Sequence, residues 1–221
     1  MSRHALLEKR PYLLLSIAAA VAYYILREGY FPELYLAFVK GAACALLATY
    51  AVLRHKGRDA LMIAAVMAIA AIADMVIEFY PREGGLVFFA SHVVALTLYL
   101  QPHNRRDHLT PSQKGAAVAL LLLTPLAAWL LSRDWGVAIY ALALGGMAGA
   151  AWTSRFSRYH VGIGVLLFVA SDMLIFARMG GAGIQSAIGN LPHLLIWPLY
   201  YIGQFLICTG VIQTLRRDHH A

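Results

Sequence analysis

The chain has 221 residues, of which 61% are hydrophobic and 13% charged, and its formal net charge at pH 7 is +7. This composition, with a positive mean hydropathy, excludes an ordinary soluble domain and predicts an integral membrane protein. The positive charge does not indicate nucleic acid as a partner, because the basic residues are scattered through short segments between apolar runs. Cys44 and Cys208 both fall inside apolar runs, which predicts packing residues and no disulfide framework.

Eight apolar runs have lengths near the roughly 20 residues that a helix needs to cross about 30 Å of hydrocarbon. In chain order, we predict helices over Pro11–Leu26, Glu33–Leu53, Ala60–Phe79, Gly85–Leu100, Lys114–Leu131, Trp135–Trp152, Val161–Ala177 and His193–Leu215. The first and the fourth are short for a full crossing. The sequence therefore predicts an all-α polytopic membrane protein, with residues 1–221 forming a single domain, a bundle of eight transmembrane helices.

The first ten residues, followed by an apolar run, resemble the start of a signal peptide. No convincing cleavage site follows them, and seven more apolar runs lie behind, so we expect the first helix to be retained. We find no internal repeat strong enough to indicate a transporter built from two halves.

The distribution of Lys and Arg predicts the orientation. With the N-terminus inside, the inner segments hold thirteen basic residues, which are Arg3, Lys9, Arg10, Arg54, Lys56, Arg58, Arg105, Arg106, Lys114, Arg155, Arg158, Arg216 and Arg217. The outer segments hold four, which are Arg27, Arg82, Arg133 and Arg178. Basic residues accumulate in cytoplasmic loops, so we expect two short cytoplasmic tails, in a bacterial inner membrane.

Polar side chains inside the apolar runs share one depth. Counted from the predicted outer end of each helix, five of them lie five to seven residues inside, and these are Lys40, Asp74, His92, Asp172 and Tyr200. At 1.5 Å per residue they lie about 8–11 Å below the outer boundary, and Gln204 lies one turn deeper than Tyr200. Because a charge in hydrocarbon is costly, we expect this layer to line one functional cavity.

Several members of the layer have a purely structural alternative. Lys40 can reach the interface through its long stem, and Tyr200 can belong to an aromatic belt. His92 can be a hydrogen-bonded core histidine, and Ser171 can bond to its own helix backbone. Glu78 lies one turn after Asp74, and a helix end in water is the simpler interpretation of it.

The two aspartates resist such interpretations, because carboxylates at this depth need partners. Two carboxylates, an ammonium and an imidazole together suit general acid–base chemistry, in which Asp74 and Asp172 serve as acid and base. Alternatives with weaker signals are a metal bound by His92 and both aspartates, and a nucleophile at Ser91 or Ser171. The sequence contains neither an H-E-x-x-H nor a G-x-S-x-G motif, and we expect no metal and no cofactor.

Five stretches also carry a resemblance to a known family. They are Lys40 early in its helix, Ala70-Ala71-Ile72-Ala73-Asp74, Phe88-Phe89-Ala90-Ser91-His92, Leu167-Phe168-Val169-Ala170-Ser171-Asp172 and Tyr200-Tyr201-Ile202-Gly203-Gln204-Phe205-Leu206-Ile207. In order and spacing they resemble the YhhN-like lysoplasmalogenase family of eight-helix membrane proteins. Members of that family hydrolyse the vinyl ether bond of lysoplasmalogens, giving a fatty aldehyde and a glycerophospho-alcohol.

The resemblance implies an ether hydrolase acting on a lysophospholipid within the surrounding membrane lipid. The catalytic candidates are Asp74, Asp172, His92 and Lys40, and the substrate-binding candidates are Tyr200, Gln204, Ser171 and Glu78. Two other classes stay open. A lipid or solute carrier would use the same polar layer for binding alone, and an ester-cleaving lysophospholipase would need a nucleophile or a metal.

The orientation can be tested with a reporter enzyme fused after the last residue. We expect a reporter that works only in the cytoplasm to be active, because thirteen of the basic residues outside the apolar runs lie on that side and four on the other. Activity of a reporter that works only outside the cytoplasm would reverse the orientation and place the polar layer in the cytoplasmic half.

Overall fold

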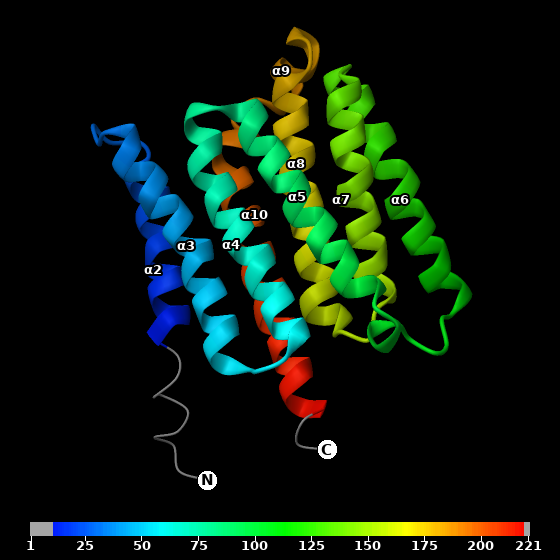
Figure 1. Ribbon diagram of the computed structural model, residues 1–221. Coiled ribbons are helices and arrows are strands. Elements are labelled where there is room, and N and C mark those ends of the chain that lie inside the picture. The colour runs from blue at the N-terminus through cyan, green and yellow to red at the C-terminus, as the bar shows by residue number, and fades with distance from the viewer. Residues whose placement is uncertain (1–10, 219–221) are drawn as a thin grey trace. The chain divides into compact units, whose positions relative to one another are not determined.

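The computed structural model describes residues 11–218, and every regular element in that range is a helix. In chain order (Figure 1) they are α2 (Pro11–Leu26), α3 (Glu33–Arg54), α4 (Arg58–Phe79), α5 (Pro81–Leu100), η1 (Pro102–Asn104), α6 (Pro111–Ser132), α7 (Trp135–Thr153), η2 (Arg158–Gly162), α8 (Ile163–Met179), α9 (Ala182–Ile188) and α10 (Leu191–Asp218). The signal-peptide-like start and the last tail residues lie outside the described range.

Seven of the described helices are long and apolar enough to cross a membrane, and α2, with 16 residues, is a shorter apolar eighth. The η2 turn joins α8 to make one of these seven spans. The predicted all-α polytopic membrane protein is therefore confirmed, and each of the eight predicted helices corresponds to one of the long helices, whereas the short α9 was not predicted.

The fourth helix is longer than predicted, because Pro81 begins a helix rather than a turn. Tyr80 alone separates α4 from α5, and its backbone N–H donates to Val76 O at 2.8 Å. Proline is well placed at the first position of a helix, since it has no N–H to leave unpaired there. The helix has 20 residues, enough for a full crossing, so the expectation of a short fourth helix was wrong.

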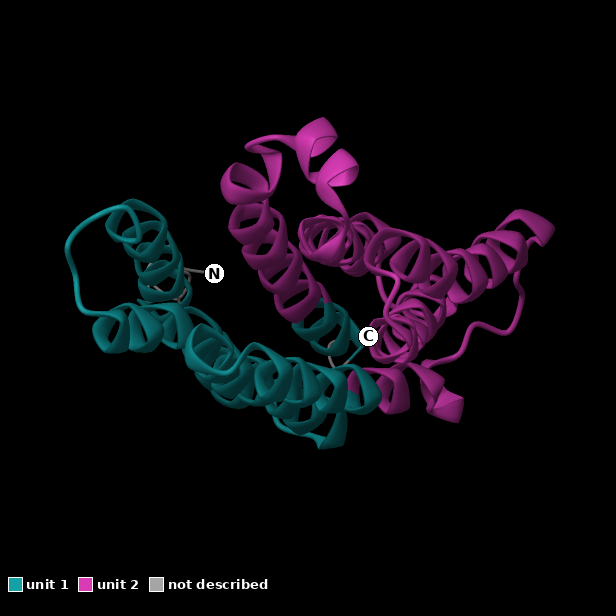
Figure 2. Ribbon diagram, turned by 90° about the horizontal axis from the view of Figure 1, so that it is seen from above, with its two compact units in different colours: residues 1–94, 211–221 teal, residues 95–210 magenta. Residues whose placement is uncertain are grey.

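The chain divides into two compact units, residues 1–94 with 211–221, and residues 95–210 (Figure 2). In the first, unit 1, α3 packs against α2 and α4, and the buried Ser16 hydroxyl of α2 donates to Ala43 O of α3 at 2.7 Å. In the second, unit 2, α6 packs against α7 and α8. The expectation that the whole chain is one domain stays a prediction.

Glycines let the helices of unit 2 approach one another closely. A Cβ atom added to Gly203 of α10 would lie 2.8 Å from Gly164 O of α8, and the reverse distance is also 2.8 Å. A Cβ atom on Gly149 of α7 would lie 2.9 Å from Ala117 O of α6. Lipid tails are as apolar as the helices, so the hydrophobic effect does not drive helices together within a bilayer. Close van der Waals packing through small residues stabilises the contacts between them instead.

We expect Gly203→Ala to lower the melting temperature of the purified protein. The added methyl group would press on the Gly164 carbonyl, and such overpacking typically costs about 1–3 kcal/mol. The matched control is Gly115→Ala in α6, where an added Cβ would meet nothing within 4 Å. This control should melt at the wild-type temperature or above it, because alanine favours helix more than glycine. Equal melting of Gly203→Ala and the control would contradict the close crossing.

Candidate functional site

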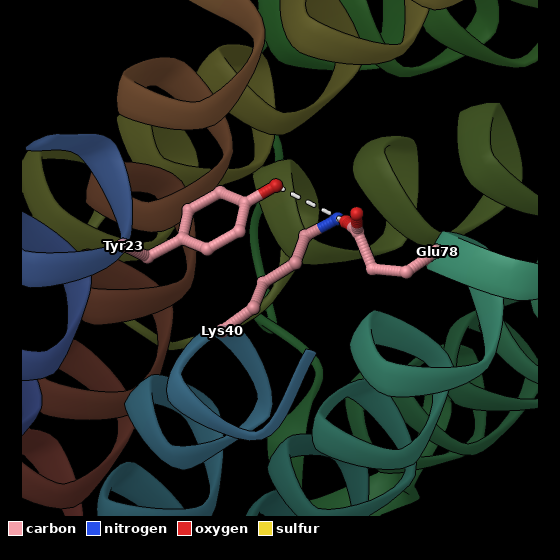
Figure 3. A network of polar contacts seen from close by, with 3 residues as sticks. All are labelled: Tyr23, Lys40 and Glu78. Carbon is pink, nitrogen blue, oxygen red and sulfur yellow. Dashed lines mark hydrogen bonds and ion pairs between the residues drawn. The ribbon is translucent and has the colours of Figure 1, made fainter. Parts of the chain in front are cut away.

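A charged cluster joins three helices of unit 1 (Figure 3). Lys40 Nζ of α3 lies 2.5 Å from Glu78 Oε1 of α4, and the Tyr23 hydroxyl of α2 donates to the same oxygen at 3.1 Å. Lys40 Nζ also lies 5.4 Å from the centre of the Tyr23 ring. One carboxylate oxygen thus receives both donors, and the Lys40 and Glu78 side chains are only 13% and 26% exposed.

The residue after Lys40 explains how the lysine reaches α4. A Cβ atom on Gly41 would lie 2.6 Å from Met75 Cγ and 2.9 Å from Ala71 O, so α3 and α4 approach closely at this level. Ala71 and Met75 flank Asp74 in the sequence of α4. The close approach therefore brings the lysine to the helix that carries both acidic candidates of unit 1.

Asp74 lies one turn before Glu78 on α4 and is 1% exposed. The Lys40 ammonium interacts electrostatically with Asp74 as well as with Glu78 and Tyr23. Three of the predicted site residues, Lys40, Asp74 and Glu78, therefore belong to one cluster. Glu78 contacts Lys40 and Tyr23, which disfavours the interpretation of Glu78 as a helix end in water.

His92 lies in α5 and is 2% exposed, so it is buried in the apolar part of the chain. The residue before it, Ser91, donates its hydroxyl to Val66 O of α4 at 3.3 Å. This bond ties α5 to the helix that carries Asp74 and Glu78. The catalytic role assigned to His92 stays a prediction.

In unit 2, the Asp172 carboxylate of α8 is held by a residue that the sequence analysis did not select. The Tyr140 hydroxyl of α7 donates to Asp172 Oδ2 at 2.8 Å, and Asp172 is 5% exposed. The Tyr140 ring meets Phe176 edge to face, with ring centres 5.8 Å apart. Tyr140 lies five residues after Trp135, so the depth count used for the other polar residues would have found it.

The other candidates of unit 2 lie where α8 and α10 cross. The buried Ser171 hydroxyl donates to Ile196 O of α10 at 2.9 Å. The Tyr200 ring lies 5.2 Å from Phe168 and 5.5 Å from Trp197, centre to centre. One turn further along α10, Gln204 is 2% exposed. Ser171 thus fastens α8 to the helix that carries Tyr200 and Gln204.

The eight predicted residues divide evenly between the units. Lys40, Asp74, Glu78 and His92 belong to unit 1, and Ser171, Asp172, Tyr200 and Gln204 belong to unit 2. The hypothesis that all of them line one cavity stays a prediction. Within residues 11–218, no group of three His, Cys, Asp or Glu side chains is placed to hold a metal ion.

The model of the YhhN family matches residues 35–211. The chain belongs to the YhhN family. The match contains all eight predicted site residues and also Tyr140, whereas Tyr23 precedes it. Neither a curated protein nor a solved structure matches the chain.

The ion pair of this YhhN protein can be tested with a double-mutant cycle on Lys40→Met and Glu78→Gln. Each single change should destabilise the protein by about 3 kcal/mol, because it leaves the other charge largely buried without its partner. The double change should cost clearly less than the sum of the two. The measurement is thermal unfolding in detergent.

A control is available at the ion pair of Arg27 and Glu28, whose atoms lie 3.3 Å apart, because the Glu28 side chain is 58% exposed although that of Arg27 is 14% exposed. Glu28→Gln should cost less than about 1 kcal/mol, as is usual for surface pairs. Additive effects of Lys40→Met and Glu78→Gln would show that the pair does not act as a unit.

Proposed function

We propose that this YhhN protein is a lysoplasmalogenase-like hydrolase that cleaves the vinyl ether bond of lysoplasmalogens. The observation that carries the proposal is the family match over residues 35–211, which includes two buried carboxylates, Asp74 and Asp172, in membrane-spanning helices. A carboxylate in hydrocarbon marks a functional site by default. The products would be a fatty aldehyde and a glycerophospho-alcohol.

The chemistry of a vinyl ether matches what buried carboxyl groups can supply. Protonation of the outer alkenyl carbon converts the carbon–carbon double bond into a single bond. It leaves an oxocarbenium ion at the carbon next to oxygen. Water adds to that carbon and loses a proton, giving a hemiacetal, which collapses to the aldehyde and the free glycerol hydroxyl. One water molecule is consumed, and the proton given by the acid is recovered from the water.

The reaction therefore needs a positioned acid and a base, and positioned proton transfer typically contributes 10²–10⁴-fold. Asp172 is the candidate acid, because its partner is the neutral Tyr140 hydroxyl. Asp74 is the candidate base, because the Lys40 ammonium lies near it and favours the ionised carboxylate. The proposal requires both groups to act on one substrate molecule, and it requires no cofactor.

Lys40, Glu78 and Tyr23 would place the base rather than react themselves. Glu78 forms the direct ion pair with Lys40. Asp74 therefore lies close to the ammonium group while Glu78 shares its charge. Tyr200, Gln204 and Ser171 are the candidate contacts of the lysophospholipid, together with Glu78 at the more exposed end of α4. The active site would open towards the outer leaflet of a bacterial inner membrane, with both termini in the cytoplasm.

The test is to incubate the purified protein with a lysoplasmalogen and, separately, with its ester counterpart. We expect aldehyde from the first and little fatty acid from the second. Asp74→Asn and Asp172→Asn should each lower the rate of aldehyde release by about 10²–10⁴-fold while the protein stays folded.

Two matched aspartates serve as controls. Asp59→Asn changes the first turn of α4, the helix of Asp74, and Asp134→Asn changes the N-cap of α7, where asparagine caps as well as aspartate. Both should keep the wild-type rate. Fatty acid release without aldehyde would identify an ester-cleaving lysophospholipase instead, and tight binding without turnover would identify a carrier.

A further inference from the structure

Polar contacts bind the two loops of unit 2 that precede α6 and α8 into one surface. Arg106 Nε donates to Ser154 O at 2.6 Å, and its Nη2 donates to Phe156 O at 3.2 Å. Arg155 Nε donates to Asn104 Oδ1 at 2.7 Å. The α5–α6 loop and the α7–α8 loop are therefore held together at this end of unit 2.

This surface is strongly basic. Residues 101–114 and 153–163 contain five Lys or Arg residues and one acidic residue, Asp107. Burial and the nearby charge of Arg158 lower the pKa of Arg106 below its ordinary value. Arg106 is bonded to the backbone of Phe156, two residues before Arg158, so this end of unit 2 carries two guanidinium groups that can bind an anion.

An apolar groove of about 390 Å³ opens on the same unit between α6 and α8. Small and aliphatic side chains line it, among them Ala116, Ala119, Leu123, Ala127, Leu166 and Val169. Along α6 the groove runs from Ala116 to Ala127, which is about 16 Å at 1.5 Å per residue. That length is about half of a hydrocarbon core ~30 Å thick, and it matches one leaflet.

The groove ends beside the basic surface. Trp152 lines the groove, and a Cβ atom added to Gly162 would lie 3.0 Å from its ring. Arg158 Cβ lies 3.4 Å from that same position. Trp152 of the groove and the base of the Arg158 side chain thus meet beside Gly162.

We propose that this groove binds one acyl chain of an anionic phospholipid, with the phosphate of that lipid on Arg106 and Arg158. The apolar walls accept any chain, and the two guanidinium groups at one end select a negatively charged headgroup. α6 is the least buried of the candidate spans, with 11% of its most apolar window buried. A bound lipid would therefore give α6 contacts that the protein itself does not supply.

This lipid is not the proposed substrate. Fourteen residues separate Arg158 from Asp172, which is about 21 Å along a helix. The bond that joins chain to glycerol lies close to the phosphate, so a phosphate on Arg158 holds that bond far from Asp172. The site acts as a lipid anchor for unit 2, and it does not depend on the reaction proposed above.

The experiment measures melting temperature in non-ionic detergent as phosphatidylglycerol, phosphatidylcholine or glycerol 3-phosphate is added. Phosphatidylglycerol should stabilise the wild type more than the other two do. Its apparent affinity should fall about fivefold in Arg158→Gln and about thirtyfold in Arg106→Gln/Arg158→Gln. Arg158→Gln keeps the bonds from Arg106 to Ser154 and Phe156, and it decides the question if the double variant does not fold.

The control for charge is Arg54→Gln/Arg58→Gln, which removes two arginines at the α3–α4 loop of unit 1 and should keep the full response. Equal stabilisation by phosphatidylcholine, or an unchanged response in Arg158→Gln, would overturn the proposal. So would full stabilisation by glycerol 3-phosphate, since that molecule carries a phosphate without a chain.

The groove is tested separately with Ala119→Phe, which places an aromatic ring in it. This variant should lose most of the response to phosphatidylglycerol. Val118→Phe, on the neighbouring residue that is 54% exposed and does not line the groove, should keep the response. If the wild type is a dimer and Ala119→Phe a monomer regardless of lipid, a second copy of the chain occupies the groove and the lipid proposal is wrong.

Discussion

A bilayer offers no water to a polar group, so each polar side chain in a spanning helix must find its partner within the protein. Lys40 illustrates the consequence. Its ammonium is met by the Glu78 carboxylate and the Tyr23 ring, which come from two other helices. The positions of α2 and α4 relative to α3 are therefore constrained by one charge, and the same contact keeps Asp74 beside a cation.

The same constraint acts on Asp172 with a different result. Its carboxylate accepts a hydrogen bond from a neutral phenol, that of Tyr140, so the two buried aspartates have electrostatic environments of different kinds. General acid–base chemistry requires two carboxyl groups in different environments, since one must hold a proton and the other must accept one. The proposed hydrolysis of a vinyl ether is a use of that difference.

Close helix crossings make these contacts possible. Gly41 lets α3 approach α4 at the level of Lys40, and the pair of Gly164 and Gly203 lets α8 approach α10 next to Ser171 and Tyr200. Between α6 and α8 of unit 2 the packing is looser, and α6 leaves an apolar groove against α8. Tight crossings thus hold the candidate catalytic residues, whereas the loose one leaves room for a lipid chain.

Much of the molecule was predictable from local features of the sequence. The apolar runs predicted the long helices and placed most of their ends within a few residues, because the length of an apolar run is a local property set by the thickness of the bilayer. The fourth helix was predicted too short, since Pro81 was interpreted as part of a turn although proline also suits a helix start. Family membership was recognisable in the same way, from motifs around Asp74, His92, Asp172 and Tyr200.

The partners of the charged residues were decided only by the tertiary structure. Depth along a helix follows from counting residues, and it identified Lys40, Asp74 and Asp172 without showing what each one touches. Tyr23 and Tyr140 emerged as partners because α2 and α7 present those rings to their neighbours. Which face of a helix meets which neighbour depends on how side chains from several helices pack together, and that is a property of the folded chain rather than of any one segment.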